Sequence, residues 1–186
     1  MVSILALWLP ILVAAVIVFV ASSILHMMLP YHRSDYGRIQ NEDDVMAAMR
    51  KAGVQPGDYM MPHCSSHTDL KNPAVLEKFK KGPVAVMTVM PSGTPTMGGQ
   101  LAQWFFYCVL VSICAAYIAG RALEPGAHYL AAFRFAGATA FFAYSLGLWQ
   151  DSIWYKKSWS TTLKNTFDGL VYGLLTGGVF GWLWPN

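Results

Sequence analysis

The fold is decided by the stretch Asp168-Gly-Leu-Val-Tyr-Gly-Leu-Leu-Thr-Gly-Gly-Val-Phe-Gly-Trp182, which ends the chain's last apolar segment. Four of its glycines follow one another at intervals of four residues, so they lie on one face of a helix. They are Gly169, Gly173, Gly177 and Gly181. A row of glycines lets two helix backbones approach closely, which is a main source of specific packing between helices in lipid. The stretch therefore predicts a membrane helix packed tightly against a neighbour.

The composition is typical of a membrane protein. The 186 residues are 55% hydrophobic and 12% charged, whereas ordinary soluble domains contain about 25% charged residues. Four segments approach the roughly 20 apolar residues that a helix needs to cross a bilayer. They are Val2 to Leu25, Gln100 to Gly120, Tyr129 to Trp149 and Asn165 to Trp184. We therefore expect an all-α membrane protein with four transmembrane helices.

The basic residues predict how the chain is oriented. We expect residues 1–30 to form the first transmembrane helix, residues 31–99 a small α/β insert, and residues 100–186 the other three helices. Basic residues close to the membrane ends gather on the side of the insert: Arg33, Arg38, Lys80, Lys81, Lys156, Lys157 and Lys164. The opposite side holds Arg121. The positive-inside rule then places the insert in the cytoplasm and both termini on the far side of a bacterial inner membrane.

Helix and strand signals divide the insert. Asn41 and Asn72 are suited to N-caps, and Gly53 and Gly82 to helix ends, which predicts helices over residues 42–52 and 73–81. The predicted strands are residues 59–61 and 84–90, which are rich in β-favouring or apolar residues. Each helix has an apolar stripe that would pack against a neighbour. The first stripe is Val45, Met46, Met49 and Ala52, and the second, which is expected to be buried, is Val75, Leu76 and Phe79.

One short stretch of the insert is a candidate metal site. His63, Cys64 and His67 offer two imidazoles and a thiol within five residues. Together with the neighbouring methionines, these soft ligands suit copper better than zinc. A second pair, His26 and His32, stands where the first segment meets the insert and adds some support for metal binding. The alternative is a structural role, because histidine and cysteine in a loop often pack without a ligand.

Polar residues inside the apolar segments are the other candidates for function. Asp168, Tyr172 and Thr176 form a polar row beside the glycines, and we expect Asp168 to pair with Lys164, Lys156 or Lys157. Arg134 lies about 8 Å inside the third segment, close enough for its side chain to reach the interface. A structural ion pair is favoured over a transport pathway for this row.

Three stretches carry a resemblance to a known family. They are Tyr59-Met-Met-Pro-His-Cys64, Lys81-Gly-Pro-Val-Ala-Val86 and Trp159-Ser-Thr-Thr-Leu-Lys-Asn-Thr-Phe-Asp-Gly-Leu-Val-Tyr-Gly173. Together with the long first apolar segment, they make the chain resemble a family of uncharacterised bacterial four-span inner-membrane proteins. The resemblance covers nearly the whole chain and implies localisation and fold. It implies no activity, cofactor or catalytic residue.

The sequence favours a structural role over a catalytic one. We expect an assembly or accessory component of the membrane that associates with itself or with another membrane protein through its last helix. The alternatives are a small oligomeric channel or transporter and a copper- or zinc-handling protein. A formal net charge of +3 without a basic run argues against a nucleic-acid partner, and no catalytic residue is predicted.

Overall fold

The computed structural model describes residues 1–66 and 68–186 and is mostly helical, with one two-stranded sheet. The chain separates into two compact units. One joins Met1–Tyr36 to Thr96–Asn186, and the other is Gly37–Pro95. The expectation of a largely helical protein with a small sheet is confirmed.

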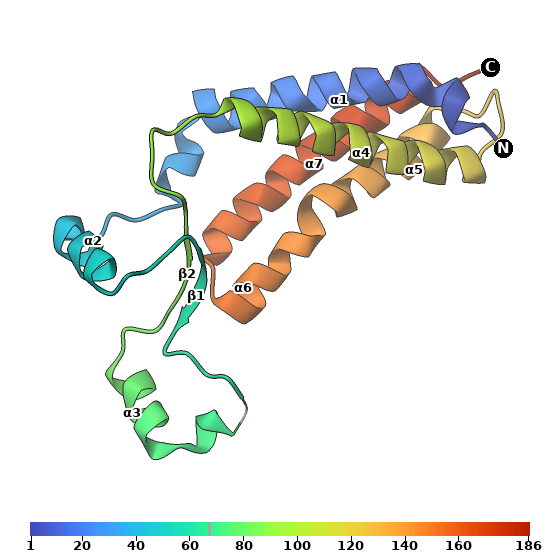
Figure 1. Ribbon diagram of the computed structural model, residues 1–186. Coiled ribbons are helices and arrows are strands. Elements are labelled where there is room, and N and C mark those ends of the chain that lie inside the picture. Colours follow the sequence, from blue (N-terminus) through green and yellow to red (C-terminus); the bar gives the residue numbers. More distant parts are fainter. Residues whose placement is uncertain (67) are drawn as a thin grey trace. The chain divides into compact units, whose positions relative to one another are not determined.

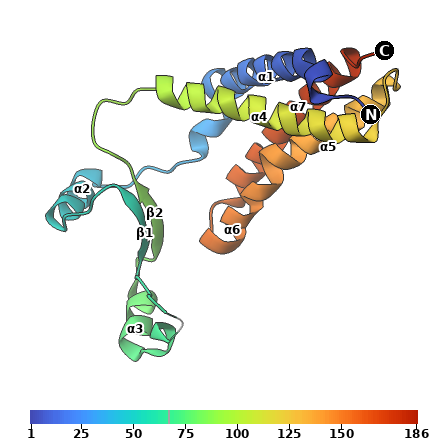
Figure 2. The ribbon, with the colours of Figure 1, turned by 45° about the vertical axis from the view of Figure 1, so that its right-hand side comes forward.

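Four long helices build the first unit: α1 (Trp8–Ser23), α4 (Gly98–Ala122), α5 (Tyr129–Ser145) and α7 (Trp159–Trp182). A short helix α6 (Trp149–Tyr155) follows a 3-10 turn (Leu146–Leu148) and comes before α7. In Figure 1, α1 lies beside α4, and α5 lies beside α7. Figure 2 shows the same two pairs from a second side.

Two of these segments have the length and hydropathy of a membrane span. The helical run Ile4–Met28 has a mean hydropathy of 2.9 in its most apolar window, and Gly98–Ala122 reaches 1.8. Four spans are not confirmed. Helix α5 has only 17 residues, and the first turns of α7 contain polar side chains between Ser160 and Asp168.

Helices α5 and α7 make the closest contact in the unit. A Cβ atom added at Gly177 would lie 2.7 Å from the carbonyl oxygen of Phe133, and one added at Gly173 would lie 2.9 Å from that of Gly137. The residues of α5 that face the glycine row recur every four positions: Tyr129, Phe133, Gly137, Phe141 and Ser145. The backbone of α5, with ring atoms of Tyr129 and Phe133, thus lies in the groove that the glycines of α7 leave open. The groove is occupied from within the same chain.

The interior of the bundle is apolar at one end and becomes polar toward the other. A cluster of small and aromatic residues fills the end that holds both termini: Val2, Leu7, Ala115, Ala119, Ala132, Ala136, Phe180 and Trp184. The loop before α5 closes this end, because Trp184 donates to the Glu124 carbonyl over 3.0 Å and Gly126 donates to the Pro185 carbonyl over 2.8 Å. The second cluster combines Ala15, Val18, Cys108 and Val111 with Tyr144 and Tyr172.

The second unit consists of helix α2 (Glu42–Lys51), strand β1 (Gly57–Met61), helix α3 (Pro73–Lys81) and strand β2 (Ala85–Val89). The strands are antiparallel, with Tyr59 opposite Met87. The order of helices and strands is as predicted, and the Asn72 side chain caps α3 by accepting from the Ala74 amide.

The expected burial of the helices in this unit is wrong. None of residues 37–66 and 68–95 is buried, and Met46 and Leu76 are 52% and 41% exposed. A two-stranded sheet with two short helices is too small to enclose a core.

Candidate functional site

Two short turns bring a pair of histidines together at the end of α1. The helix widens into a π turn over Ile24–Met28, which contains His26, and Pro30 then starts a 3-10 turn over Pro30–Ser34, which contains His32. Proline lacks the amide proton that would continue the helical hydrogen bonds, so the chain changes direction here. The two imidazole rings consequently stack, with their centroids 4.2 Å apart.

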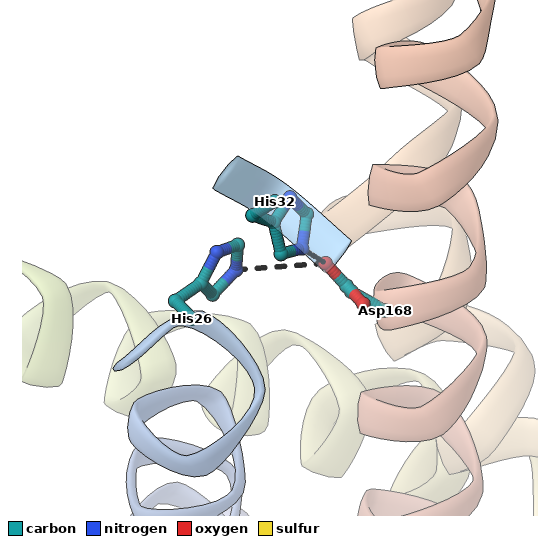
Figure 3. A group of neighbouring side chains, drawn as sticks. All are labelled: His26, His32 and Asp168. Carbon is teal, nitrogen blue, oxygen red and sulfur yellow. Dashed lines mark hydrogen bonds and ion pairs between the residues drawn. The ribbon is translucent and has the colours of Figure 1, made fainter. Parts of the chain in front are cut away.

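Asp168 of α7 is the centre of the cluster (Figure 3). It is 2% exposed, and its Oδ2 lies 2.8 Å from His32 Nε2 and 3.5 Å from His26 Nε2. The other oxygen, Oδ1, accepts a hydrogen bond from the Tyr31 hydroxyl. The expected pairing of Asp168 with a lysine is therefore wrong, because Tyr31 and His32, 137 and 136 positions away in sequence, take its two oxygens.

Asp35 holds the far side of the His32 ring. Its Oδ2 lies 2.6 Å from His32 Nδ1, and its Oδ1 accepts from the Lys164 ammonium over 2.8 Å. The same ammonium donates to the Tyr31 carbonyl and the Ser34 hydroxyl. Lys164, one turn before Asp168 on α7, thus fastens the turn that contains His32 to the helix that contains Asp168.

The charges of this cluster do not balance without a further cation. The side chains of Asp35 and Asp168 are 8% and 3% exposed, and Lys164 is the only lysine or arginine that pairs with either of them in the described part of the chain. An uncompensated carboxylate in such a place is strongly destabilising. Both nitrogens of His32 face carboxylate oxygens, so a proton or a metal ion can stand between Nε2 and Asp168.

The surroundings shift the ionisation of two groups in the turn. Burial raises the pKa of the Tyr31 phenol, and its hydrogen bond to the negatively charged Asp168 raises it further. Burial also opposes ionisation of Asp35, but hydrogen bonds from Lys164 and His32 outweigh it, so the pKa of Asp35 is lowered. Tyr31 is therefore a neutral hydrogen-bond donor at physiological pH, and Asp35 is an anion.

The three ligand atoms converge on one point. One nitrogen each of His26 and His32 and one oxygen of Asp168 all lie within 4.8 Å of one another. The remaining nitrogen of His32 is bound to a carboxylate, which is the arrangement that orients a metal-ligating histidine. Two imidazoles and one carboxylate form a known ligand set for catalytic zinc and for non-haem iron, and it leaves coordination positions open.

A cavity of about 450 Å³ adjoins these ligands. His26, Asn165 and Asp168 form its polar part, and most of the other lining residues are aromatic: Trp104, Tyr107, Tyr144 and Tyr172. Trp104 and Tyr107 are already hydrogen-bonded, to the Ser22 hydroxyl and the Ala143 carbonyl. The volume lies within the range of sites for small molecules.

Several hydroxyl groups in the interior of the bundle are buried. Those of Tyr172, of Ser112 on α4 and of Thr176 on α7 are unpaired among the described residues, and that of Tyr144 lies against the Cys108 thiol. A buried hydroxyl without a partner costs about 1 to 3 kcal/mol.

The candidate site residues predicted from sequence lie in several parts of the structure. Asp168, Tyr172 and Thr176 are all buried on one face of α7, whereas Arg134 is exposed on α5. His63 lines an open pocket of the second unit with Lys78 and Lys81, and Cys64 is half-buried. His67 lies outside the described residues.

Two groups that fix this cluster were not predicted from sequence: Tyr31, which donates to Asp168, and Asp35, which holds the far side of His32. Tyr31 and Asp35 carry no motif, and only the tertiary fold places them against α7. The nearest signal was the pair His26 and His32 at the end of an apolar segment, because histidines at a membrane interface are uncommon without a partner.

Comparison with protein-family models, with curated proteins and with solved structures gave no match. The family resemblance of the three sequence stretches therefore stays a prediction.

Proposed function

We propose that the protein is a metal-binding integral membrane protein that holds a divalent transition-metal ion between His26, His32 and Asp168. The observation that carries the proposal is the position of His32. One of its nitrogens faces Asp168 at 2.8 Å and the other faces Asp35 at 2.6 Å. Carboxylate support of this kind fixes the tautomer of a metal ligand and raises its basicity.

Two of the three separations between ligand atoms are close to those that an ion requires. Zn–N and Zn–O distances of about 2.0 to 2.2 Å place two ligand atoms of a tetrahedral site about 3.3 Å apart. His26 Nε2 and Asp168 Oδ2 are 3.5 Å apart, and the 2.8 Å between His32 Nε2 and Asp168 Oδ2 has to widen by about 0.5 Å. The ion would also supply the positive charge that the cluster lacks.

The ligand types favour zinc or ferrous iron over copper. Imidazole and carboxylate ligands suit Zn²⁺ and Fe²⁺, whereas Cu⁺ prefers thiolate and thioether sulfur. Met27 and Met28 are adjacent to His26 in sequence, but their side chains are 62% and 72% exposed. Because His26 and Asp168 also line the cavity, a coordination position of the ion would open toward it.

We further propose that all four long helices cross an inner membrane, with the metal site at the cytoplasmic end. The basic residues near α6 and in the insert support this orientation by the positive-inside rule. The exposed apolar side chains of α5 and α7 support it as well, because Phe135, Phe142, Leu170 and Leu174 are each at least 42% exposed. Such surfaces are stable in lipid and unfavourable in water.

The other functions suggested by the sequence have less support. Self-association was expected because of the glycine row, but α5 of the same chain fills that groove. A transport pathway along Asp168, Tyr172 and Thr176 would continue into the cluster around Ala119 and Phe180, both fully buried. The polar row is therefore better suited to a one-sided site than to a passage.

Metal analysis tests the proposal directly. Protein purified without chelators and without a metal-affinity column is expected to contain one zinc or iron per chain by inductively coupled plasma mass spectrometry. The His32→Ala and Asp168→Asn variants should lose it. His128→Asn is a matched control, because His128 is exposed and caps α5, a role that asparagine also fulfils.

A separate variant tests the alternative metal site in the insert. The double variant His63→Ala, His67→Ala should keep the ion if the proposal is correct. Loss of the ion in this variant together with its retention in His32→Ala would move the site to the insert. A wild-type protein that contains no metal and takes up neither added zinc nor added ferrous iron would refute metal binding altogether.

A further inference from the structure

A groove of about 290 Å³ lies on the surface of the bundle, between α5 and α7. Its floor is the contact between the two backbones, where a Cβ atom added at Gly173 would lie 2.9 Å from the Gly137 carbonyl oxygen. The walls are apolar side chains from both helices: Phe133, Ala138 and Phe141 of α5, and Leu170 and Leu174 of α7. Ala138 and the two leucines are exposed, so this surface groove is open to the surroundings of the bundle.

Arg134 is the one charged residue in the lining of the surface groove. It is exposed, and it forms no ion pair with an aspartate or glutamate of residues 1–66 and 68–186. An arginine in a membrane-spanning helix is costly unless it meets a partner or reaches the interface. Arg134 lies about 8 Å along α5 from Tyr129, so its side chain can extend to the head groups, whose anions are lipid phosphates.

The surface groove extends from the level of Arg134 toward the middle of the bundle. Phe133 and Phe141, which line its two ends on α5, are about 12 Å apart along the helix axis. One leaflet accounts for about 15 Å of the hydrocarbon core of a bilayer. The groove is therefore long enough to hold most of one acyl chain while the head group of the same lipid lies beside Arg134.

The charges decide which molecule fits best. A guanidinium binds phosphate through two parallel hydrogen bonds. Zwitterionic phospholipids carry a cation next to the phosphate, which Arg134 repels, whereas phosphatidylglycerol carries the negative charge alone. A second copy of this chain would cover the apolar walls but would bring no anion, because α1, α4 and α5 contain no acid and the Asp168 of α7 is buried.

We propose that the surface groove between α5 and α7 binds one anionic phospholipid, with an acyl chain over Gly137 and Gly173 and the phosphate on Arg134. The lipid belongs to the leaflet opposite the metal ligands, because Arg134 and Asp168 lie near opposite ends of the bundle. The proposal rests on the proposed crossing of the membrane by α5 and α7. It does not involve the metal ion.

Native mass spectrometry of the delipidated full chain tests this proposal. Palmitoyl-oleoyl phosphatidylglycerol is expected to saturate one site about tenfold more tightly than phosphatidylcholine with the same chains, as for one hydrogen bond to a charged group. Arg134→Gln should abolish the preference, and Arg134→Lys, which keeps the charge but not the paired hydrogen bonds, should abolish part of it. Arg121→Gln is the matched control, because it removes the same charge where Arg121 lies over the Tyr117 ring of α4.

A second variant tests the apolar part of the surface groove. Ala138→Trp adds a large side chain to an exposed wall without changing a charge, so it should weaken binding of phosphatidylglycerol although Arg134 is present. Ala102→Trp, at an exposed position of α4 outside the groove, should bind the lipid like the wild type. The melting temperatures of both variants in detergent show that they are folded.

Equal affinity for the two lipids, or equal effects of Arg134→Gln and Arg121→Gln, would overturn the lipid site. A wild-type dimer that Ala138→Trp dissociates in the absence of lipid would also overturn it, because a second copy would then occupy the groove. A chain that binds zinc and whose α5 crosses the membrane, but which does not distinguish the two lipids, loses the lipid site alone. A chain that contains no metal but prefers phosphatidylglycerol through Arg134 supports the lipid site and refutes only metal binding.

Discussion

Asp35 accepts a hydrogen bond from His32 Nδ1 over 2.6 Å and so leaves the other nitrogen of the ring facing Asp168. The two carboxylates come from separate parts of the fold, since Asp35 follows the 3-10 turn after α1 and Asp168 lies on α7. His32 is therefore held from both sides by groups that are themselves fixed. A ring in this position cannot rotate without breaking a charge-assisted hydrogen bond.

Asp35→Asn should weaken metal binding while it leaves all three ligands in place. The substitution removes the negative charge that raises the basicity of the His32 ring, and loss of such a supporting carboxylate typically costs 10- to 100-fold in affinity. Competition with a chromophoric zinc chelator measures the change. Asp151→Asn, in an exposed pair with Lys157, should bind zinc like the wild type. Equal affinity in Asp35→Asn and Asp151→Asn would contradict the supporting role.

Lys164→Met should destabilise the first unit. It leaves the Asp35 carboxylate, 8% exposed, without its cation, and a buried charge that loses its partner typically costs about 3 kcal/mol. The double variant Lys164→Met, Asp35→Asn removes both charges and should recover part of the loss. Reversible unfolding in mixed micelles with increasing SDS gives the free energies. Additive effects of the two substitutions would show that the two side chains do not interact.

Gly177→Ala and Gly178→Ala make a matched pair of adjacent substitutions. A Cβ atom at Gly177 would lie 2.7 Å from the Phe133 carbonyl and 3.1 Å from the Gly137 Cα, whereas at Gly178 its nearest neighbour would be the Tyr129 hydroxyl at 3.8 Å. We expect Gly177→Ala to lower the free energy of unfolding by about 1 to 3 kcal/mol and Gly178→Ala to leave it equal or raise it. Thermal unfolding in detergent distinguishes the two, and equal melting temperatures would contradict tight packing of α7 on α5.

The packing of α7 shows what the sequence could reveal. A glycine at every fourth position fixes which face of the helix admits a close neighbour, because the property is local. The neighbour itself depends on loop lengths and on the other faces. In the structure the neighbour is α5, which presents Phe133, Gly137 and Phe141 to the glycines and turns Ala132 and Ala136 toward the interior.

The site at Asp168 was less predictable. An acid inside an apolar segment indicates that a partner exists, and lysines one turn away were the obvious choice from sequence alone. In the structure Lys164 instead donates to another acid, Asp35, and Asp168 contacts His32. Which acid pairs with which cation depends on the position of the turn after α1. Pro30 and the π turn set that position, and no local sequence pattern predicts where it lies relative to α7. Side chains far apart in sequence meet only through the tertiary fold.

Cysteine labelling on the two sides of α5 tests whether the third and fourth helices cross the membrane. In a background in which Cys64, Cys108 and Cys114 are replaced, Pro125→Cys and Lys156→Cys place single thiols at exposed positions before α5 and after α6. The basic residues near Lys156 predict that it faces the cytoplasm. An impermeant maleimide added to intact spheroplasts should then label Pro125→Cys at once and Lys156→Cys only after permeabilisation.

A third labelling position tests whether α7 crosses the membrane. Asn186→Cys should label from outside like Pro125→Cys, because the Gly126 amide donates to the Pro185 carbonyl and holds the two loops together. Labelling of Pro125→Cys and Lys156→Cys from the same side would mean that α5 does not cross. The cluster around Asp168 lies on the α6 side of the bundle, so that result would also remove the cytoplasmic placement of the metal site, although the ligand geometry within the unit would stand.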